Sequence, residues 1–186
     1  FDNGYPGNLN VSVKYTLSNR NILDIEFYAI SDRNTIFNPT SHSYFNLNPR
    51  AKTIVKHRLK INSSKFLEID DDFIPTGEFK NASSTPFDFL SEKIIGDDLN
   101  KNNKQLNIAK GYDHCFVLNK GEKIAAELSE LESGRLIQIF TDQPGIQLYT
   151  GNHLKGVFSK NQGLCLETQH FPNSPNISSF PSTLLK

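Results

Sequence analysis

Strict alternation of apolar and polar residues is the feature that most constrains the fold of this chain. From Asn10 to Leu17, every second residue is Val, Tyr or Leu, and the residues between them are polar. A period of two sends successive side chains to opposite faces, so this segment predicts a half-buried β-strand. A second alternating segment, Ile22 to Ile30, follows the polar turn Ser18–Asn21. Together they predict an antiparallel hairpin.

Short strand signals recur along the chain, whereas no segment predicts a helix longer than two turns. Thr35 to Leu47 reads as an extended segment broken by Pro39, and Ser133-Gly134 reads as a hairpin turn. The further predicted strands are 58–62, 114–118, 125–128, 136–141, 146–150 and 164–168. Many short strands without alternating helices predict an all-β fold, an antiparallel sandwich or barrel.

Two segments predict irregular structure. Residues 63–111 are rich in Pro, Gly, Asp, Asn and Ser, and only Ser91 to Ile95 indicates a helical turn. A loop this long is uncommon in a compact domain, so it predicts binding loops on a rigid scaffold or elements that the pattern hides. The tail 171–181 has prolines at 172, 175 and 181, which predict neither a helix nor an inner strand.

Length and charge bound the class of protein. The 186 residues suit one domain, and 20 Lys plus Arg balance 20 Asp plus Glu. Without a basic excess, neither nucleic acid nor a membrane surface is expected as a partner. The sequence has no run of eighteen apolar residues, so we expect neither a membrane span nor a signal peptide, and its two cysteines, Cys115 and Cys165, are too few for a disulfide framework. These features predict a cytoplasmic protein. Because Met is absent even at position 1, we expect that the chain has lost its start or has been cut from a longer product.

Several titratable residues stand in apolar or aromatic company. Glu167, in the run Leu164 to Thr168, is either an edge or outward-facing acid or, if its face lines a concave sheet, a general base with a raised pKa. His42 is either structural or catalytic. Asp113 follows Gly111-Tyr112, where an Asp commonly caps a turn.

Other chemistries receive less support. A metal site could draw on His114, Cys115, Cys165 and His170, but their spacings match no zinc pattern. The sequence contains neither a G-x-S-x-G nucleophile elbow nor a glycine-rich phosphate loop.

Taken in order, the short motifs of this chain resemble the signature blocks of the aldose 1-epimerases, the galactose mutarotases. The resemblance covers nearly the whole chain. The matching blocks are Gly4–Gly7, His42–Leu47, Ile74–Glu78, Thr85–Phe89, Gly111–His114, Pro144–Asn152, Leu166–Asn176 and Phe180–Thr183.

The resemblance implies a large antiparallel β-sandwich of which residues 1–186 form the carboxy-terminal portion, within a single domain. It implies interconversion of the α and β anomers of a free hexose, such as galactose or glucose, with no cofactor and no metal. Glu167 would be the general base and His42 the general acid. Asp113 would accept hydrogen bonds from sugar hydroxyls, and Gln147 would hold another hydroxyl or orient the base. Tyr44 and Phe171 could offer aromatic surface to the sugar, although core packing is the favoured role for both.

The chain also departs from the family pattern. Ser41 stands where an asparagine usually precedes the histidine, and Cys115 stands where asparagine is common. Family members run to somewhat under twice this length, and their amino-terminal half supplies an arginine and a second histidine to the sugar site. That half of the same protein is therefore an expected partner. The alternative functions are a non-catalytic carbohydrate-binding sandwich, or a fragment that is inactive and self-associates without its missing half.

Overall fold

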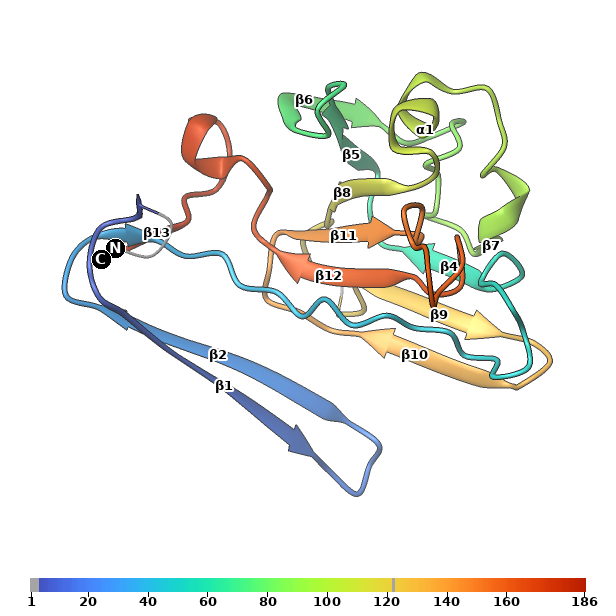
Figure 1. The fold of residues 1–186 in the computed structure, drawn as a ribbon, viewed down its shortest axis with the longest axis horizontal. Helices are drawn as coiled ribbons and strands as arrows, with labels where there is room; N and C mark the ends of the chain where they lie inside the picture. The colour runs from blue at the N-terminus through green and yellow to red at the C-terminus, as the bar shows by residue number, and fades with distance from the viewer. Residues whose placement is uncertain (1–3, 122) are drawn as a thin grey trace. The chain divides into compact units, whose positions relative to one another are not determined.

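The computed structural model describes residues 4–121 and 123–186, which form two compact units (Figure 1). The first unit holds the described residues up to Pro39 together with Ser182–Lys186. The second holds Thr40–Pro181, where all the sequence-predicted site residues lie.

The first unit is built on the predicted hairpin. Strand β1 (Leu9–Leu17) pairs antiparallel with β2 (Leu23–Ser31) along its whole length. Asn21, at a φ of 57°, closes the turn between them, because Asn tolerates the left-handed region better than most residues. A short pairing of β3 (Thr35–Ile36) with β13 (Leu184–Leu185) completes the unit. The predicted hairpin is confirmed.

The prediction that the first strand is half-buried is wrong. Val11 and Val13 are each 41% exposed, and Leu17 is 76% exposed. The alternation correctly predicts the strand, but burial needs a second layer of structure. Among the residues of this unit that the structure describes, no second layer covers the two-stranded sheet.

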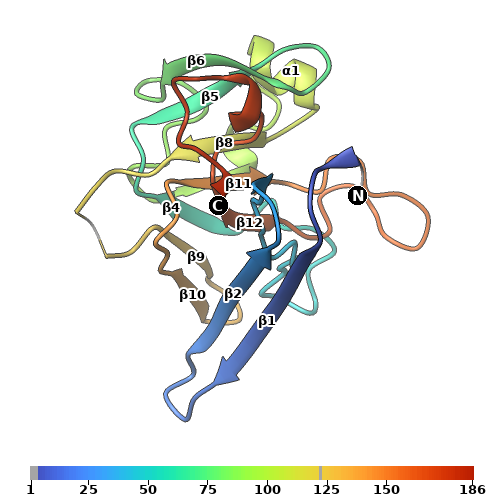
Figure 2. The ribbon, with the colours of Figure 1, turned by 90° about the vertical axis from the view of Figure 1, so that its left-hand side faces the viewer.

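The second unit consists of two antiparallel sheets, seen as layers in Figures 1 and 2. The first has the strand order β12-β11-β8-β5-β6, and the second has the order β10-β9-β4-β7. The bounds are β4 (Arg58–Ile61), β5 (Lys65–Ile69), β6 (Pro75–Asn81), β7 (Lys93–Ile94), β8 (Asp113–Val117), β9 (Ala126–Glu130), β10 (Arg135–Ile139), β11 (Gly145–Tyr149) and β12 (Cys165–Gln169). The predicted all-β antiparallel class is confirmed.

Buried side chains from both sheets join in one core cluster. Its members from the four-stranded sheet include Leu59 and Leu128, and those from the five-stranded sheet include Phe116, Ile146 and Leu148, all 0% exposed. Burying one such side chain is worth about 1.5–3 kcal/mol. The main core therefore lies between the sheets. A second cluster of Leu67, Cys115, Phe171 and Phe180 covers part of the other face of the five-stranded sheet, and the rest of that face can hold a site.

Residues 63–111 contain regular elements that the sequence analysis missed. Strands β5 and β6 form a hairpin here, and helix α1 (Lys104–Ala109) follows, capped by the Asn103 side chain. The predicted helical turn at Ser91–Ile95 is wrong, because Lys93–Ile94 form β7 and a 3₁₀ turn, η2 (Ile95–Asp97), begins only where β7 ends. Pro75 and Gly77 interrupt the alternation of β6 and hide it in the sequence.

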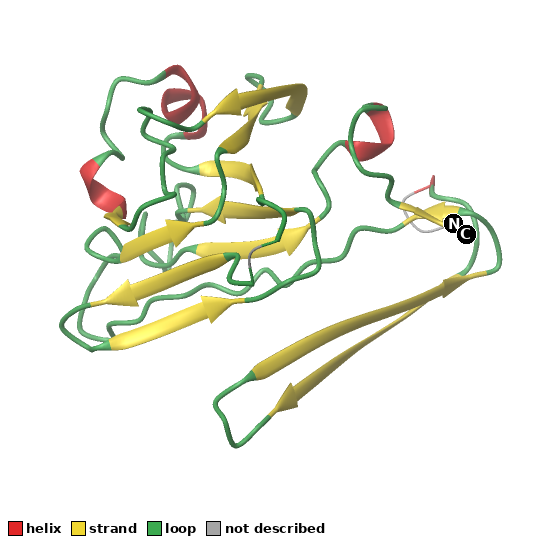
Figure 3. Cartoon of the chain, turned by 180° about the vertical axis from the view of Figure 1, so that it is seen from behind, coloured by secondary structure: helices red, strands yellow, loops and turns green. Residues whose placement is uncertain are grey.

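Helix is scarce in the described residues (Figure 3). In the proline-rich tail, the chain makes one 3₁₀ turn, η3 (Ser174–Asn176), which contains Pro175. The prediction that this tail contains no helix is therefore wrong for this one turn. Proline fits because the first turn of a helix needs no backbone donor from it. None of the helices in the described residues has the length and apolar character needed to cross a membrane.

Candidate functional site

The segment that carries His42 lies along the edge of the five-stranded sheet. Among the described residues, β12 is the terminal strand of that sheet. Phe45 and Leu164 exchange two backbone hydrogen bonds, of 2.7 and 3.0 Å, and the Thr40 hydroxyl donates to the Thr168 carbonyl at 3.0 Å. These contacts hold residues 40–45 against β12. His42, which lies between them, is thereby placed beside Cys165 and Glu167.

The strand register places the predicted site residues on one face of the sheet. Gln147 of β11 pairs with Glu167 of β12, and Tyr149 pairs with both Cys165 and Asp113. Directly paired residues, and residues two apart along a strand, share a face. The intervening residues, such as Leu148 and Leu166, point into the core instead.

His42 stands between Glu167 and Cys165. Its Nε2 lies 3.5 Å from Glu167 Oε1, and its Nδ1 lies 3.4 Å from Cys165 Sγ. The His42 side chain is 55% exposed, whereas that of Glu167 is 9% exposed. The reading of Glu167 as an outward-facing acid is therefore wrong, although its strand is an edge strand. The pair combines a sheltered carboxylate with an imidazole that solvent can reach.

Burial sets the electrostatics of the acidic groups. It raises the pKa of Glu167, and the nearby Asp113 carboxylate adds to the rise while His42 opposes it. Burial also raises the pKa of Asp113, against a hydrogen bond from Gln147 that favours its ionised form. For Cys165, burial raises the pKa to about 12, so the thiol keeps its proton at neutral pH. It can then donate to His42 Nδ1 when that nitrogen carries no proton.

Asp113 and Gln147 form a second polar pair on the same face. Gln147 Nε2 donates to Asp113 Oδ1 at 2.8 Å. Gln147 Oε1 is buried and has no hydrogen-bond partner among the described residues. A buried acceptor of this kind is costly unless a ligand or water donates to it. The geometry therefore leaves one buried acceptor without a donor among the described residues.

Aromatic rings surround the His42 side chain. The ring of Tyr44 lies 5.1 Å from that of His42, and Tyr149 lies 6.3 Å from it. Tyr149 also stacks with His153 at 6.5 Å, and its hydroxyl accepts from the His153 backbone at 3.0 Å. Tyr44 is 47% exposed, so its ring is available to a ligand rather than packed in the core. Phe171 differs, because it packs at 4% exposure in the small core cluster with Cys115 and Phe180.

The four residues considered for a metal site in the sequence do not meet. Adjacent residues on a strand point to opposite faces, so His114 enters the main core beside Phe87 while Cys115 joins the cluster on the other face. His170 contacts Gln143 at 2.9 Å. Cys165 belongs with His42 and Glu167, as described above.

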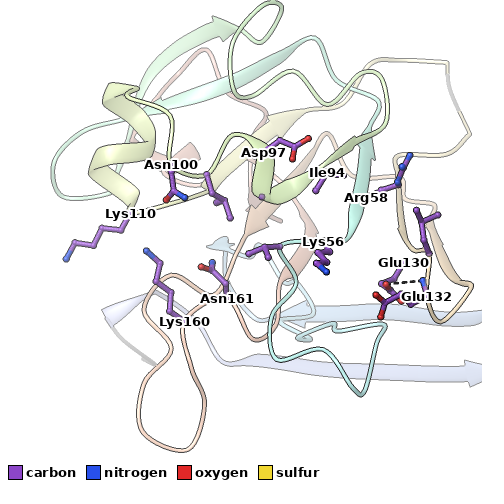
Figure 4. A pocket seen from close by; sticks show the side chains of 14 residues that line it. Lys56, Arg58, Ile94, Asp97, Asn100, Lys110, Glu130, Glu132, Lys160 and Asn161 are labelled. Atoms are coloured by element: carbon purple, nitrogen blue, oxygen red, sulfur yellow. Dashed lines mark hydrogen bonds between the residues drawn. The ribbon is translucent and has the colours of Figure 1, made fainter.

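A cavity of about 620 Å³ lies elsewhere in the second unit (Figure 4). Basic and acidic side chains line it together, among them Lys56, Lys110, Lys160, Glu130 and Glu132. None of the site residues named above contributes to its lining. The His42–Glu167 pair therefore lies on an open sheet face and not in this cavity.

Comparison with known proteins decides the family. The sequence model of the aldose 1-epimerase family matches residues 1–186. The chain belongs to the aldose 1-epimerase family. It is 39% identical to the galactose mutarotase of Sus scrofa over all of its own length and 56% of that protein. It is 35% identical to the aldose 1-epimerase of Escherichia coli, covering 97% of this chain and 55% of that one. The chain thus spans little more than half the length of these epimerases.

Solved structures of epimerase relatives share the fold. An aldose epimerase homologue from C. elegans superposes with a TM-score of 0.91 at 30% identity, covering 100% of this chain and 57% of that chain. A galactose 1-epimerase from Lactobacillus acidophilus gives a TM-score of 0.86 at 33% identity, covering 99% of this chain and 56% of that chain. The predicted mutarotase-like sandwich is therefore confirmed.

The sequence analysis of this epimerase-family chain missed three neighbours of the site. It does not propose Tyr149 or His153 for the site. It considers Cys165 only as a metal ligand. Alternation along β11 and β12 could have placed Tyr149 with Gln147, and Cys165 with Glu167. The contact between Cys165 and His42 spans 123 positions, and no sequence pattern predicts it.

Proposed function

We propose that this chain supplies the acid and base of an aldose 1-epimerase, which interconverts the α and β anomers of a free hexose. The observation that carries the proposal is the 3.5 Å separation of His42 Nε2 and Glu167 Oε1. Opening the ring needs one proton removed from the C1 hydroxyl and one delivered to the ring oxygen. Because both oxygens are bonded to C1, the acid and the base must lie close together, as these two groups do.

The proposed reaction has two proton transfers in each direction. The Glu167 carboxylate takes the proton from the C1 hydroxyl, the bond from C1 to the ring oxygen breaks, and His42 in its protonated form gives a proton to that oxygen. The open chain carries an aldehyde at C1. Rotation about the C1–C2 bond presents the other face of the aldehyde, and reversal of both transfers closes the ring as the other anomer.

The surroundings of Glu167 suit a general base. Burial raises its pKa, so its carboxylate is a stronger base than an exposed one. Protonated His42 favours the ionised form of Glu167 and so keeps the base available. His42 therefore supports the protonation state that Glu167 needs as a base.

Asp113 and Gln147 are proposed to hold the sugar. Asp113 would accept from one sugar hydroxyl, and the unpartnered Gln147 Oε1 would accept from another. Tyr44 would present its exposed ring to the apolar face of the hexose. A non-catalytic sugar-binding role is less well supported, because binding alone does not require an acid beside a base. A cytoplasmic location and the choice between galactose and glucose also stay predictions.

Polarimetry of freshly dissolved α-galactose or α-glucose tests the proposal. We would assay the 186-residue chain alone, and the chain fused to the part of the Sus scrofa mutarotase that lies outside the matched region. The active form is whichever of the two accelerates mutarotation. Two folded preparations that both leave the uncatalysed rate unchanged would contradict the proposed function.

A further inference from the structure

Three side chains with metal-binding atoms converge at the candidate site. A ring nitrogen of His42, Sγ of Cys165 and a carboxylate oxygen of Glu167 all lie within 4.8 Å of one another. Imidazole, thiolate and carboxylate are the ligand types that zinc takes in proteins. Within residues 4–121 and 123–186, no other group of three or more such residues meets this distance.

The local structure holds these three side chains together, with Cys165 and Glu167 buried and His42 exposed above them. Cys165 and Glu167 are two positions apart on β12, so one strand holds both on the same face. His42 comes from the flanking segment, and its exposed side chain can turn to offer one nitrogen. Ligand atoms around a tetrahedral zinc ion lie roughly 3.3–3.8 Å apart, given bonds of about 2.0–2.3 Å. The two short contacts of the His42 ring use different nitrogens, Nδ1 to Cys165 Sγ at 3.4 Å and Nε2 to Glu167 Oε1 at 3.5 Å. Because only one nitrogen can bind the ion, the set that matters is one atom from each residue, all within 4.8 Å, and binding needs a small turn of the ring to bring these atoms into range.

Charge and ligand type select the class of ion. Binding replaces the Cys165 proton, which leaves to solvent, with a metal–sulfur bond. One thiolate and one carboxylate then balance a divalent ion, and neutral His42 completes three protein ligands. Calcium and magnesium prefer oxygen ligands throughout, so this set favours a thiophilic ion.

We propose that His42, Cys165 and Glu167 bind a thiophilic divalent cation such as Zn²⁺, and that the bound ion blocks the epimerase site. The ion would occupy both groups that move protons in the proposed reaction. The blocking part rests on the proposed function, whereas the binding part does not.

Cobalt spectroscopy on the metal-free 186-residue chain tests the binding part. Co²⁺ bound to a thiolate gives a charge-transfer band in the near ultraviolet, and Zn²⁺ should displace it. We expect one equivalent to bind and the band to vanish in Cys165→Ser. His42→Asn, a change at an exposed position, should weaken cobalt binding by about 100-fold or more, since even indirect partners of a metal cost 10–100-fold.

The second cysteine supplies the matched control. Cys115 is buried in the cluster with Leu67, Phe171 and Phe180, apart from the three ligands, so Cys115→Ala should keep the band. A band that survives in Cys165→Ser, cobalt affinity that is unchanged in His42→Asn, or no band in the wild-type chain would each overturn the proposal.

The blocking part has its own measurement. In the active form, Zn²⁺ should suppress mutarotation, a chelator should restore it, and excess hexose should weaken cobalt binding. Full activity at saturating Zn²⁺ would overturn blocking. The cobalt band could change in the variants as expected while neither preparation accelerates mutarotation. That result would support the ion site and contradict the proposed function.

Discussion

Burial of the Glu167 side chain has two opposing effects. Its burial beneath His42 raises its pKa, which strengthens it as a base, but the same burial makes its ionised form costly in the folded state. Carboxylates with a raised pKa destabilise a fold at the pH where they are ionised. The residue therefore illustrates how a site can gain reactivity at the expense of stability.

Removing this charge should stabilise the fold in a pH-dependent way. Below the ordinary pKa of 4.5, Glu167 is protonated in both states and adds no cost. As pH rises through the raised pKa of the folded state, the cost becomes complete and stability falls. Glu167→Gln should thus raise the melting temperature more at about pH 8 than at about pH 3.5. Glu78→Gln, an exposed change, is the control, and an equal gain at both pH values would contradict the burial argument.

Asp113 should affect binding more than the chemical step. Its contact with a sugar hydroxyl would be present in both the ground and the transition state, so its loss weakens both equally. In the active form, Asp113→Asn should raise KM by more than it lowers kcat. Steady-state kinetics checks this. A loss confined to kcat would instead assign Asp113 a part in the proton transfers.

His42 should set one limb of the pH profile. An acid must carry its proton to act, so activity that depends on protonated His42 falls as the ring deprotonates. In the active form, His42→Asn should lower kcat/KM by about 10²–10⁴-fold and remove that limb. An unchanged pH profile in the variant would leave His42 as a sugar ligand at most.

At the scale of elements, Gln105 connects helix α1 to strand β5. Its Oε1 accepts from the Ile69 backbone N–H at 2.8 Å, and its Nε2 donates to the Ile69 carbonyl at 2.8 Å. It also lies 3.2 Å from Nε2 of buried His114, whose pKa burial lowers to about 3. Neutral His114 accepts the Asp113 backbone N–H on Nδ1, so its Nε2–H is free to donate to Gln105. The helix thus supplies hydrogen-bond partners for the backbone of Ile69 at the end of β5, and it contacts His114 of β8, the strand that carries Asp113.

Losing this connection should destabilise the second unit. Gln105→Ala leaves two backbone groups of buried Ile69 without partners, at a cost of about 2–4 kcal/mol in the free energy of unfolding. Urea denaturation measures it. Gln138→Ala, on exposed β10, is the control and should change stability by less than about 0.5 kcal/mol. Equal effects from the two variants would show that the Gln105 bonds carry no special weight.

The elements also show which parts of the fold a sequence reveals. The hairpin β1–β2 and strands β8 to β12 were predictable, because their alternation is regular and polar turns separate them. Strand β6 was hidden because Pro75 opens it and Gly77 interrupts it, although a proline at the first position of a strand is tolerated. Helix α1, with six residues, is too short to show a helical period.

The candidate site divides in the same way. His42, Asp113, Gln147 and Glu167 were named from short motifs, and the strand register brings them to one face. The ring contacts of Tyr149 and the approach of Cys165 to His42 were not predictable, because they depend on how a non-strand segment lies along β12. Pairing over more than a hundred residues leaves no local signal.

At the scale of the whole molecule, the chain aligns with 57% of the C. elegans homologue, yet it keeps the fold of that part at a TM-score of 0.91. Within that half, the two sheets enclose one core and turn the opposite face of the five-stranded sheet to the site. The acid and base of the proposed reaction are therefore both positioned by this chain.

The central claim is that Glu167 is the base of the proposed epimerase site, and polarimetry of Glu167→Gln tests it most directly. The substitution keeps the volume of the side chain and removes only its ability to take a proton. With the active form, a folded variant and saturating hexose, we predict that mutarotation falls by about 10²–10⁴-fold. A loss of activity of only about threefold or less would contradict the account, because it is far smaller than the usual rate contribution of a general base.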